Sequence, residues 1–198
     1  MILETIGLFV GVVIILALYY KLWFLRDPER DIPKKGIICP ADGKVVMIKK
    51  FEKNKIKIDK KFLGQVKTFT SDVCETGYIV SIFMNVFNVH INRAPISGVV
   101  KYVEHKSGKF LNASKLESTF ENENVQILIH QGQKKIKVIQ IAGLIARRIV
   151  PFVKSGQKIT RGQRIGLIKL GSQVTIIMPD KPKVKVGDKV YAGKTILA

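Results

Sequence analysis

The longest hydrophobic run lies near the start of the chain. Residues 6–20 read IGLFVGVVIILALYY and carry no charge, and apolar residues resume after Lys21. A helix over residues 6–25 would be about 30 Å long at about 1.5 Å per residue, which matches the hydrocarbon core of a bilayer. Two tyrosines and Trp23 lie towards the end of the run, where aromatic rings suit the headgroup layer. We therefore predict a membrane anchor helix over residues 1–25.

A cleaved signal peptide is the main alternative for this run. Such peptides start with a basic segment and end at a cleavage site made of small residues. Here Glu4 is the only charge before the run, and no such site follows it, so an uncleaved anchor is favoured. Basic residues outnumber acidic ones in residues 21–35. The positive-inside rule then predicts that the rest of the chain lies on the cytoplasmic side of the cell membrane.

Beyond the anchor, the apolar positions occur in short segments instead of one continuous run. Residues 26–35, RDPERDIPKK, are expected to form a charged linker. Residues 36–198 contain runs rich in Val and Ile between Gly, Asn and Asp turns, among them GKVVMIKKF, KKIKVIQIAG and QVTIIMP. Closely spaced strands without a long helical stripe predict one mainly β domain, a compact barrel or sandwich.

Two internal repeats support the β prediction. The segment VKSGQKITRG over residues 153–162 recurs 31 residues later as VKVGDKVYAG over residues 184–193. PADGKV, starting at Pro40, and PISGVV, starting at Pro95, share the pattern P-x-x-G-x-V. Such turns resemble the half-repeats of lipoyl-like barrels. This likeness is informative about the fold and says little about function.

The chain is strongly basic, with 34 Lys and Arg against 15 Asp and Glu and a formal net charge of +19. A nucleic-acid site usually combines clustered arginines with aromatic stacking platforms, which this sequence lacks, so we predict no nucleic-acid partner. Given an anchor, attraction to an anionic membrane leaflet explains the charge better. The two cysteines, Cys39 and Cys74, lack metal-ligand spacing, and we predict no metal site.

Three polar islands interrupt the predicted strands. They are Asp42 in CPADGKV, His90 with Arg93 in NVFNVHINRAPISG, and the pair Gly171-Ser172 in KLGSQVTIIMP. Each has an ordinary explanation when taken alone: a turn residue, a core histidine with a surface charge, and a glycine at a β-bulge. Their significance depends on their occurring together in one chain.

Together these islands resemble the phosphatidylserine decarboxylase proenzymes, in the short form found in archaea and many bacteria. The similar segments follow the family order and cover nearly everything after Arg26: PADGKV, FMNVFNVHINRAPISGVV, SGKFLNAS, ENEN, IAGLIARRIV, GQRIGLIKLGSQV and VKVGDKVYAGKTILA. The resemblance implies a carboxy-lyase that converts phosphatidylserine, or the archaeal ether lipid archaetidylserine, to the corresponding ethanolamine phospholipid.

The resemblance also implies autocatalytic cleavage between Gly171 and Ser172. A serine hydroxyl can attack the preceding carbonyl and turn the amide into an ester, and glycine leaves that approach open. Elimination and hydrolysis then leave a pyruvoyl group in place of Ser172, whose carbonyl binds a substrate amine and accepts the electrons released with carbon dioxide. The expected products are a β chain, 1–171, and an α chain, 172–198, which remain together as a heterodimer; higher oligomers are left open.

Roles for the other candidates follow from the same resemblance. His90 is expected to handle the proton in both self-cleavage and decarboxylation, because imidazole changes charge near neutral pH, and Asp42 is expected to orient it. Arg147 or Arg148 is expected to bind the substrate phosphate or carboxylate. Many family members carry H-x-x-H-x-P where this chain has HINRAP. Arg93 therefore replaces the second histidine and is a further candidate for binding substrate.

Two alternatives from other functional classes explain less of the sequence. A noncatalytic, membrane-anchored adaptor with a lipoyl-like barrel accounts for the anchor and the repeats, and a nucleic-acid-binding module accounts only for the charge. Neither accounts for NVHINRAP or LGSQ. Because every candidate site residue follows the anchor, we also expect self-cleavage to be independent of residues 1–25.

Overall fold

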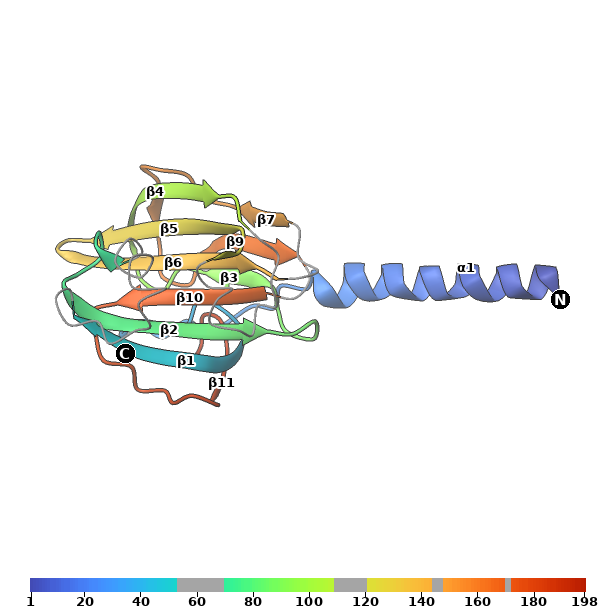
Figure 1. The fold of residues 1–198 in the computed structure, drawn as a ribbon, viewed down its shortest axis with the longest axis horizontal. Coiled ribbons are helices and arrows are strands. Elements are labelled where there is room, and N and C mark those ends of the chain that lie inside the picture. The colour runs from blue at the N-terminus through green and yellow to red at the C-terminus, as the bar shows by residue number, and fades with distance from the viewer. Residues whose placement is uncertain (53–69, 109–120, 144–147, 170–171) are drawn as a thin grey trace.

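The N-terminal helix projects from a β domain (Figure 1). The computed structural model describes residues 1–52, 70–108, 121–143, 148–169 and 172–198. The helix α1 (Ile2–Leu18) continues as a wider π-helical segment, η1 (Tyr19–Phe24). No side chain of α1 is buried, and the combined helix has a mean hydropathy of 2.5 and sufficient length to cross a membrane. The predicted apolar N-terminal helix is confirmed.

The described part of the β domain consists of two antiparallel sheets. Its strands are β1 (Gly43–Glu52), β2 (Thr76–Met84), β3 (Ile91–Arg93), β4 (Gly98–Lys106), β5 (Asn124–Gln131), β6 (Lys134–Ala142), β7 (Arg148–Pro151), β8 (Lys158–Ile159), β9 (Arg164–Lys169), β10 (Ser172–Met178) and β11 (Lys189–Val190). Eight strands form a curled half-barrel in the order β11-β1-β2-β10-β6-β5-β4-β8, and three form a small sheet in the order β3-β9-β7. The mainly β prediction is confirmed.

Strand β10 lies in the middle of the large sheet, between β2 and β6, and is buried along its whole length. Val174, Ile176 and Met178 join the main core, together with residues of the small sheet, whereas Ile177 joins a second cluster on the opposite face. Side chains alternate between the two faces of a strand. Ser172 therefore shares the face of Val174 and is directed towards the main core.

The sequence repeat corresponds to a duplicated pair of strands. Gly43 at the start of β1 pairs with Val190 of β11, and Gly98 at the start of β4 pairs with Ile159 of β8. A Cβ atom at either glycine would lie 2.2 Å from a carbonyl oxygen of a neighbouring strand, so a larger residue does not fit without a shift of the backbone. Each P-x-x-G-x-V segment thus pairs with one of the repeated V-K-x-G segments, as expected for lipoyl-like half-repeats.

The segment predicted as a charged linker, residues 26–35, contains no helix or strand but lies against the β domain. Its Asp27 forms an ion pair with Arg93 of β3, with 2.7 Å between Asp27 Oδ1 and Arg93 Nη2. Arg30 forms an ion pair with Asp42 at 3.0 Å. Much of the charge of this segment is therefore paired with residues of the β domain, which fixes where the helix joins the domain.

Candidate active site

Ser172 occupies the first position of β10, at the end of the sheet from which the helix projects (Figure 1). It is fully buried, opposite Met84 of β2 and Ala142 of β6. Its Oγ donates to the Met84 sulfur at 3.5 Å. Because a thioether is a weak acceptor, this contact holds the hydroxyl only loosely. Gly171, the other residue of the expected cleavage site, lies outside the described residues.

His90 lies between β2 and β3 and is fully buried. Its Nδ1 lies 2.9 Å from the Asn88 carbonyl oxygen, which can only accept a hydrogen bond, so Nδ1 carries the proton. Its Nε2 is buried and has no hydrogen-bond partner among the described residues. The pKa of His90 is lowered from 6.5 to about 4, mainly by burial and to a smaller extent by the nearby charge of Arg26, while the Asn88 hydrogen bond opposes the shift. At neutral pH the ring is uncharged and presents a lone pair at Nε2.

The strand pairing brings His90 to the same end of the domain as Ser172. The next residue, Ile91, pairs with Leu167 of β9, and β9 ends at Lys169, three positions before Ser172. Three residues span at most about 11 Å, so the expected cleavage segment is confined to this end.

The Met84 sulfur, which contacts Ser172, also accepts from Asn92 Nδ2 at 3.9 Å. The chain around His90 and the chain around Ser172 therefore meet at Met84.

Sequence analysis missed a buried pair of amides beside this meeting point. Gln140 of β6 donates from Nε2 to Asn92 Oδ1 at 2.7 Å, and both residues are fully buried. Gln140 Oε1 has no partner among the described residues. The signal in the sequence was a polar amide within each of two otherwise strand-like segments, Asn92 in VHIN and Gln140 in VIQIA. An amide oxygen without a partner, close to Ser172 in the fold, is suited to a polar substrate group.

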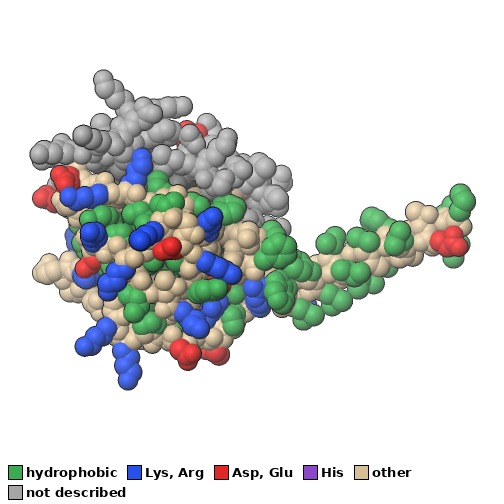
Figure 2. All heavy atoms as spheres, turned by 90° about the horizontal axis from the view of Figure 1, so that it is seen from below, with side chains coloured by type: hydrophobic (Ala, Val, Ile, Leu, Met, Phe, Trp, Pro, Cys, Tyr) green, Lys and Arg blue, Asp and Glu red, His purple; other side chains and the backbone are tan. Residues whose placement is uncertain are grey.

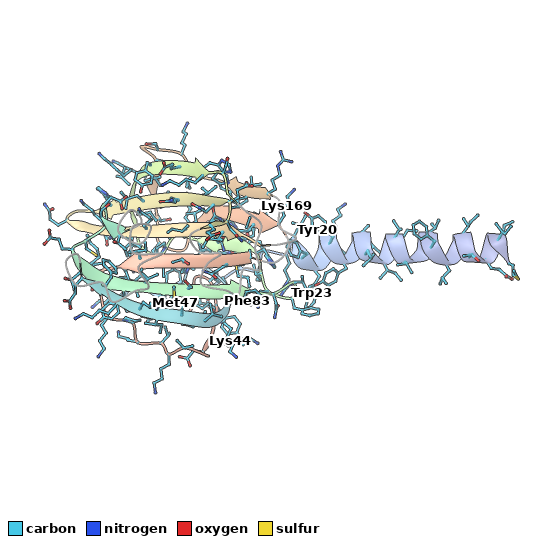
Figure 3. The ribbon with its side chains drawn as sticks, viewed as in Figure 1. Tyr20, Trp23, Lys44, Met47, Phe83 and Lys169 are labelled. Atoms are coloured by element: carbon cyan, nitrogen blue, oxygen red, sulfur yellow. The ribbon has the colours of Figure 1, made fainter. Side chains whose placement is uncertain are left out.

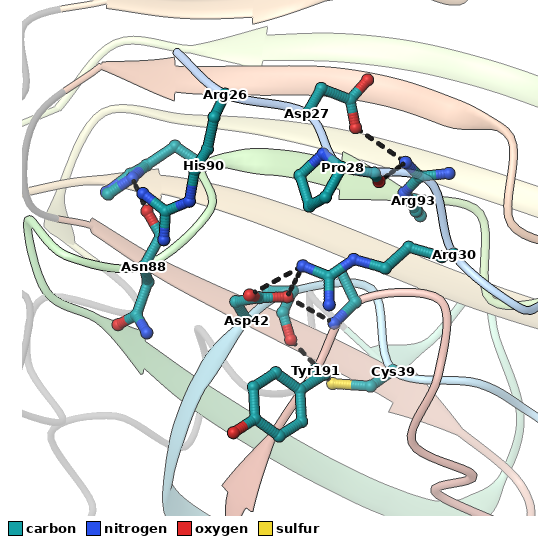
Figure 4. Close-up of polar contacts among 12 residues, drawn as sticks. Arg26, Asp27, Pro28, Arg30, Cys39, Asp42, Asn88, His90, Arg93 and Tyr191 are labelled. Atoms are coloured by element: carbon teal, nitrogen blue, oxygen red, sulfur yellow. Dashed lines mark hydrogen bonds and ion pairs between the residues drawn. The ribbon is translucent and has the colours of Figure 1, made fainter. Parts of the chain in front are cut away.

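Asp42, expected to orient His90, makes no hydrogen bond or ion pair with it among the described residues. Its carboxylate accepts from Arg30 at 3.0 and 3.2 Å, and its Oδ1 accepts from the Ala192 backbone N at 2.7 Å (Figure 4). Ser97 makes the equivalent bond in the second copy of the repeat, accepting from a backbone N at 2.9 Å. Asp42 thus stabilises a duplicated turn, and the Asn88 carbonyl orients His90.

The three candidate arginines differ in their environments. Arg93 is buried, and it donates to Asp27 at 2.7 Å and to the Pro28 carbonyl oxygen at 3.1 Å (Figure 4). It also donates to the Gly162 carbonyl oxygen at 3.1 Å. In this structure its guanidinium holds residues 27–28 on the domain. Arg148, the first residue of β7, is exposed, and Arg147 lies outside the described residues.

No three His, Cys, Asp or Glu side chains gather into a possible metal site in the described part of the chain.

The last residue of the helix packs against His90, a contact that bears on the expectation that self-cleavage is independent of residues 1–25. The ring of Phe24, the last residue of η1, is fully buried, and its centroid lies 4.1 Å from that of His90. Tyr20, one turn earlier, stacks on Phe24 at 5.4 Å. Phe24 therefore excludes water from the imidazole and contributes to its lowered pKa. Sequence analysis missed it because an aromatic residue at a helix end is also typical of a membrane interface.

Comparison with known proteins places the chain in a family. Residues 20–198 match the family model described as phosphatidylserine decarboxylase. The phosphatidylserine decarboxylase proenzyme of Desulfotalea psychrophila is 42% identical over 191 residues, which cover 93% of this chain and 81% of that protein. The proenzyme of Burkholderia vietnamiensis is 39% identical over 188 residues, covering 92% and 80%. This chain belongs to the phosphatidylserine decarboxylase family, whose members are carboxy-lyases.

Proposed function

We propose that this chain cleaves itself between Gly171 and Ser172 and then decarboxylates a membrane phospholipid with a serine headgroup, using a pyruvoyl group derived from Ser172. The observation that carries this proposal is that buried Ser172 and a buried, neutral His90 lie at the same end of the domain, where the chain segments around both meet at Met84, and that His90 Nε2 has no partner among the described residues. Family membership makes the chain a decarboxylase, so the noncatalytic adaptor is no longer a candidate.

Self-cleavage begins at the Ser172 hydroxyl. Its Oγ attacks the Gly171 carbonyl carbon, the amide C–N bond breaks and an ester forms. His90 Nε2 is the proposed base that removes the Cα proton of Ser172, after which the ester C–O bond breaks and Gly171 leaves as a carboxylate. Water then hydrolyses the new dehydroalanine to pyruvoyl and ammonia. A buried, uncharged imidazole with a free lone pair suits this proton transfer.

The residues around position 172 fit the pyruvoyl group. It retains the three carbons of serine and lacks the nitrogen, so the space beside Met84 and Asn92 accommodates it. When bound there, it would accept the electron pair that is released as the substrate carboxylate departs. His90 is proposed to return a proton to the substrate carbon. Its lowered pKa makes the protonated ring a strong acid in this site.

The substrate is proposed to reach the site from the membrane that holds α1 and η1, with the β domain on the cytoplasmic side. The headgroup is the same in ester and ether lipids, so phosphatidylserine and archaetidylserine both fit this chemistry. Arg147, Arg148 and Arg93 remain the proposed partners of the substrate phosphate or carboxylate. For Arg93, this role requires release of its present contact with Asp27.

The two chains are proposed to stay together after cleavage. The α chain would contain β10, which pairs with β2 and β6 on its two sides, and β11, which pairs with β1. Separating it would expose the buried face of β10 and break these hydrogen bonds. A heterodimer of β and α chains follows, and this argument leaves a higher oligomer open.

Intact-mass analysis of purified protein tests the proposal directly. The expected result is two chains, one ending at Gly171 and one covering residues 172–198, the second lighter by one ammonia than a peptide that starts with serine. Vesicles containing serine phospholipid should then release carbon dioxide. An active preparation that contains only the uncut chain would contradict the proposal.

Two deletions should separate anchoring from catalysis. Removing residues 1–18 leaves η1, so Phe24 still covers His90, and self-cleavage is expected at close to the full-length rate. Removing residues 1–25 takes Phe24 away and lets water reach the imidazole, so cleavage should be slower. The rate is read from the fraction of cut chain over time after synthesis.

Phe24→Ala in the full-length chain is the control for this comparison. It keeps the helix and should reproduce the slower cleavage of the longer deletion. Equal rates in both deletions would show that the contact between Phe24 and His90 has no part in the reaction.

A further inference from the structure

A patch of exposed apolar side chains surrounds the base of the helix. It consists of Leu22, Trp23, Val86 and Phe87, which are 68%, 50%, 36% and 65% exposed, and we call it the apolar rim. Two of these residues come from η1 and two from the loop after β2. In Figure 2, hydrophobic side chains gather where the helix meets the domain, and Figure 3 places Trp23 at this junction. The rim thus extends the apolar surface of the helix onto the β domain.

The loop that carries Val86 and Phe87 satisfies its backbone polar groups internally. Asn85 N bonds to Asn88 Oδ1 at 2.9 Å, Phe87 N to Asn85 Oδ1 at 3.0 Å, and Asn88 N to Asn85 O at 3.0 Å. A backbone N–H or C=O group that enters an apolar layer without a hydrogen-bond partner is strongly unfavourable, because it loses its hydrogen bonds to water. This pattern of bonds lowers the cost of moving the loop out of water.

The helix satisfies two further carbonyl groups of the loop. Tyr19 donates its hydroxyl to the Val86 oxygen at 3.0 Å, and Arg26 donates to the Phe87 oxygen at 2.7 Å. The side chains of Val86 and Phe87 remain exposed while their carbonyl groups are bonded. An apolar surface with a satisfied backbone, fixed to the base of a helix of membrane-spanning length, is suited to the boundary between headgroups and acyl chains.

Basic residues lie at the same end of the domain. Lys44, the second residue of β1, lies at this end and is exposed, and Arg148 pairs across the small sheet with Lys169. Figure 3 shows Lys44 and Lys169 at the end of the domain nearest the helix. Positive side chains close to an apolar rim favour a bilayer that contains anionic lipid over an uncharged surface.

We propose that the apolar rim inserts into the boundary layer of an anionic bilayer, so that the loop between β2 and β3 is held in the membrane beside the anchor. This proposal depends on the proposed function at one point only, namely that α1 and η1 anchor the protein in a membrane. The loop connects Met84, which contacts Ser172, to His90. Its insertion would hold the candidate site at the level of the lipid headgroups, where a serine headgroup lies.

The single tryptophan of the chain makes the proposal measurable. In full-length protein that carries Trp23→Phe, Phe87→Trp introduces a fluorescent probe into the loop. The protein is reconstituted in vesicles of phosphatidylcholine and phosphatidylglycerol with brominated acyl chains, which quench tryptophan within the acyl region. A matched probe, Gln133→Trp, lies at the exposed tip between β5 and β6, at the opposite end of the domain (Figure 1).

The probe at position 87 is expected to lie about 5–10 Å into the boundary between headgroups and acyl chains. Bromines near the headgroup end should therefore quench it several-fold more strongly than the probe at position 133. If Phe87→Trp does not fold, Val86→Trp in the same background gives the same reading. Equal, weak quenching of both probes would overturn the proposal. A probe that lipid does not quench but that is shielded from a water-soluble quencher would overturn it in favour of a second protein copy.

Self-cleavage of the same variants is followed by mass, which keeps this proposal separate from the proposed function. Quenched but uncut protein would support the rim and contradict the proposed chemistry. Cut, active protein in which the loop probe is not quenched would support the proposed chemistry and contradict the insertion of the rim.

Discussion

Replacing Ser172 with alanine is expected to leave the chain uncut and without decarboxylase activity. Alanine removes only Oγ, so neither the ester nor the pyruvoyl group can form. The methyl group fits the buried position opposite Met84, and the hydrogen bond that is lost, 3.5 Å to a thioether, is weak. The fold should therefore persist. Intact mass should show a single chain, and vesicles with serine phospholipid should release no carbon dioxide above background.

Ser81→Ala is the matched control for this change. Ser81 lies on β2, is buried, and shares a 2.8 Å hydrogen bond with Thr175 of β10. Its removal makes the same chemical change in the neighbouring strand and costs a stronger bond, at about 1 kcal/mol. This variant should still cleave and turn over. Cleavage of Ser172→Ala at the same peptide bond would contradict the proposed nucleophile.

The general organisation of the molecule was predictable because it depends on local and periodic signals. A long uncharged apolar run can form little other than a helix, and strands rich in Val and Ile between glycine turns favour a sheet. The two V-K-x-G segments, 31 residues apart, became two equivalent strand pairs because the P-x-x-G-x-V segment that pairs with each of them carries its own close-packed glycine, Gly43 or Gly98. Such signals do not require knowledge of which strands are neighbours.

The contacts of the candidate site were not predictable in this way, because they join segments far apart in the chain. Asp42 was expected near His90, yet Arg30 and the Ala192 backbone occupy its carboxylate. Nothing in the sequence near Phe24 indicates that it meets His90, since a membrane-interface aromatic and a buried aromatic look alike in one dimension. Local patterns identified the candidate residues, and the tertiary fold decided their partners.

Replacing His90 with alanine should slow self-cleavage by about 10²- to 10⁴-fold, the usual contribution of a general base. His130→Ala is the control, since His130 lies at the end of β5 away from Ser172 and should leave the rate unchanged. If His90 serves both reactions, the small amount of cut variant should also turn over slowly per pyruvoyl group. Normal turnover by that cut material would restrict His90 to maturation.

The dependence of cleavage on pH gives a second test, because only uncharged His90 can act as a base. An ordinary histidine would lose this form as the pH falls through 6.5, whereas burial lowers the pKa of His90 to about 4. The wild-type rate should therefore stay level below neutrality and fall only as the pH approaches about 4. Phe24→Ala admits water and raises the pKa, so its rate should begin to fall at a higher pH. A wild-type rate that already halves near 6.5, unchanged in Phe24→Ala, would mean that a solvated group other than His90 limits the reaction.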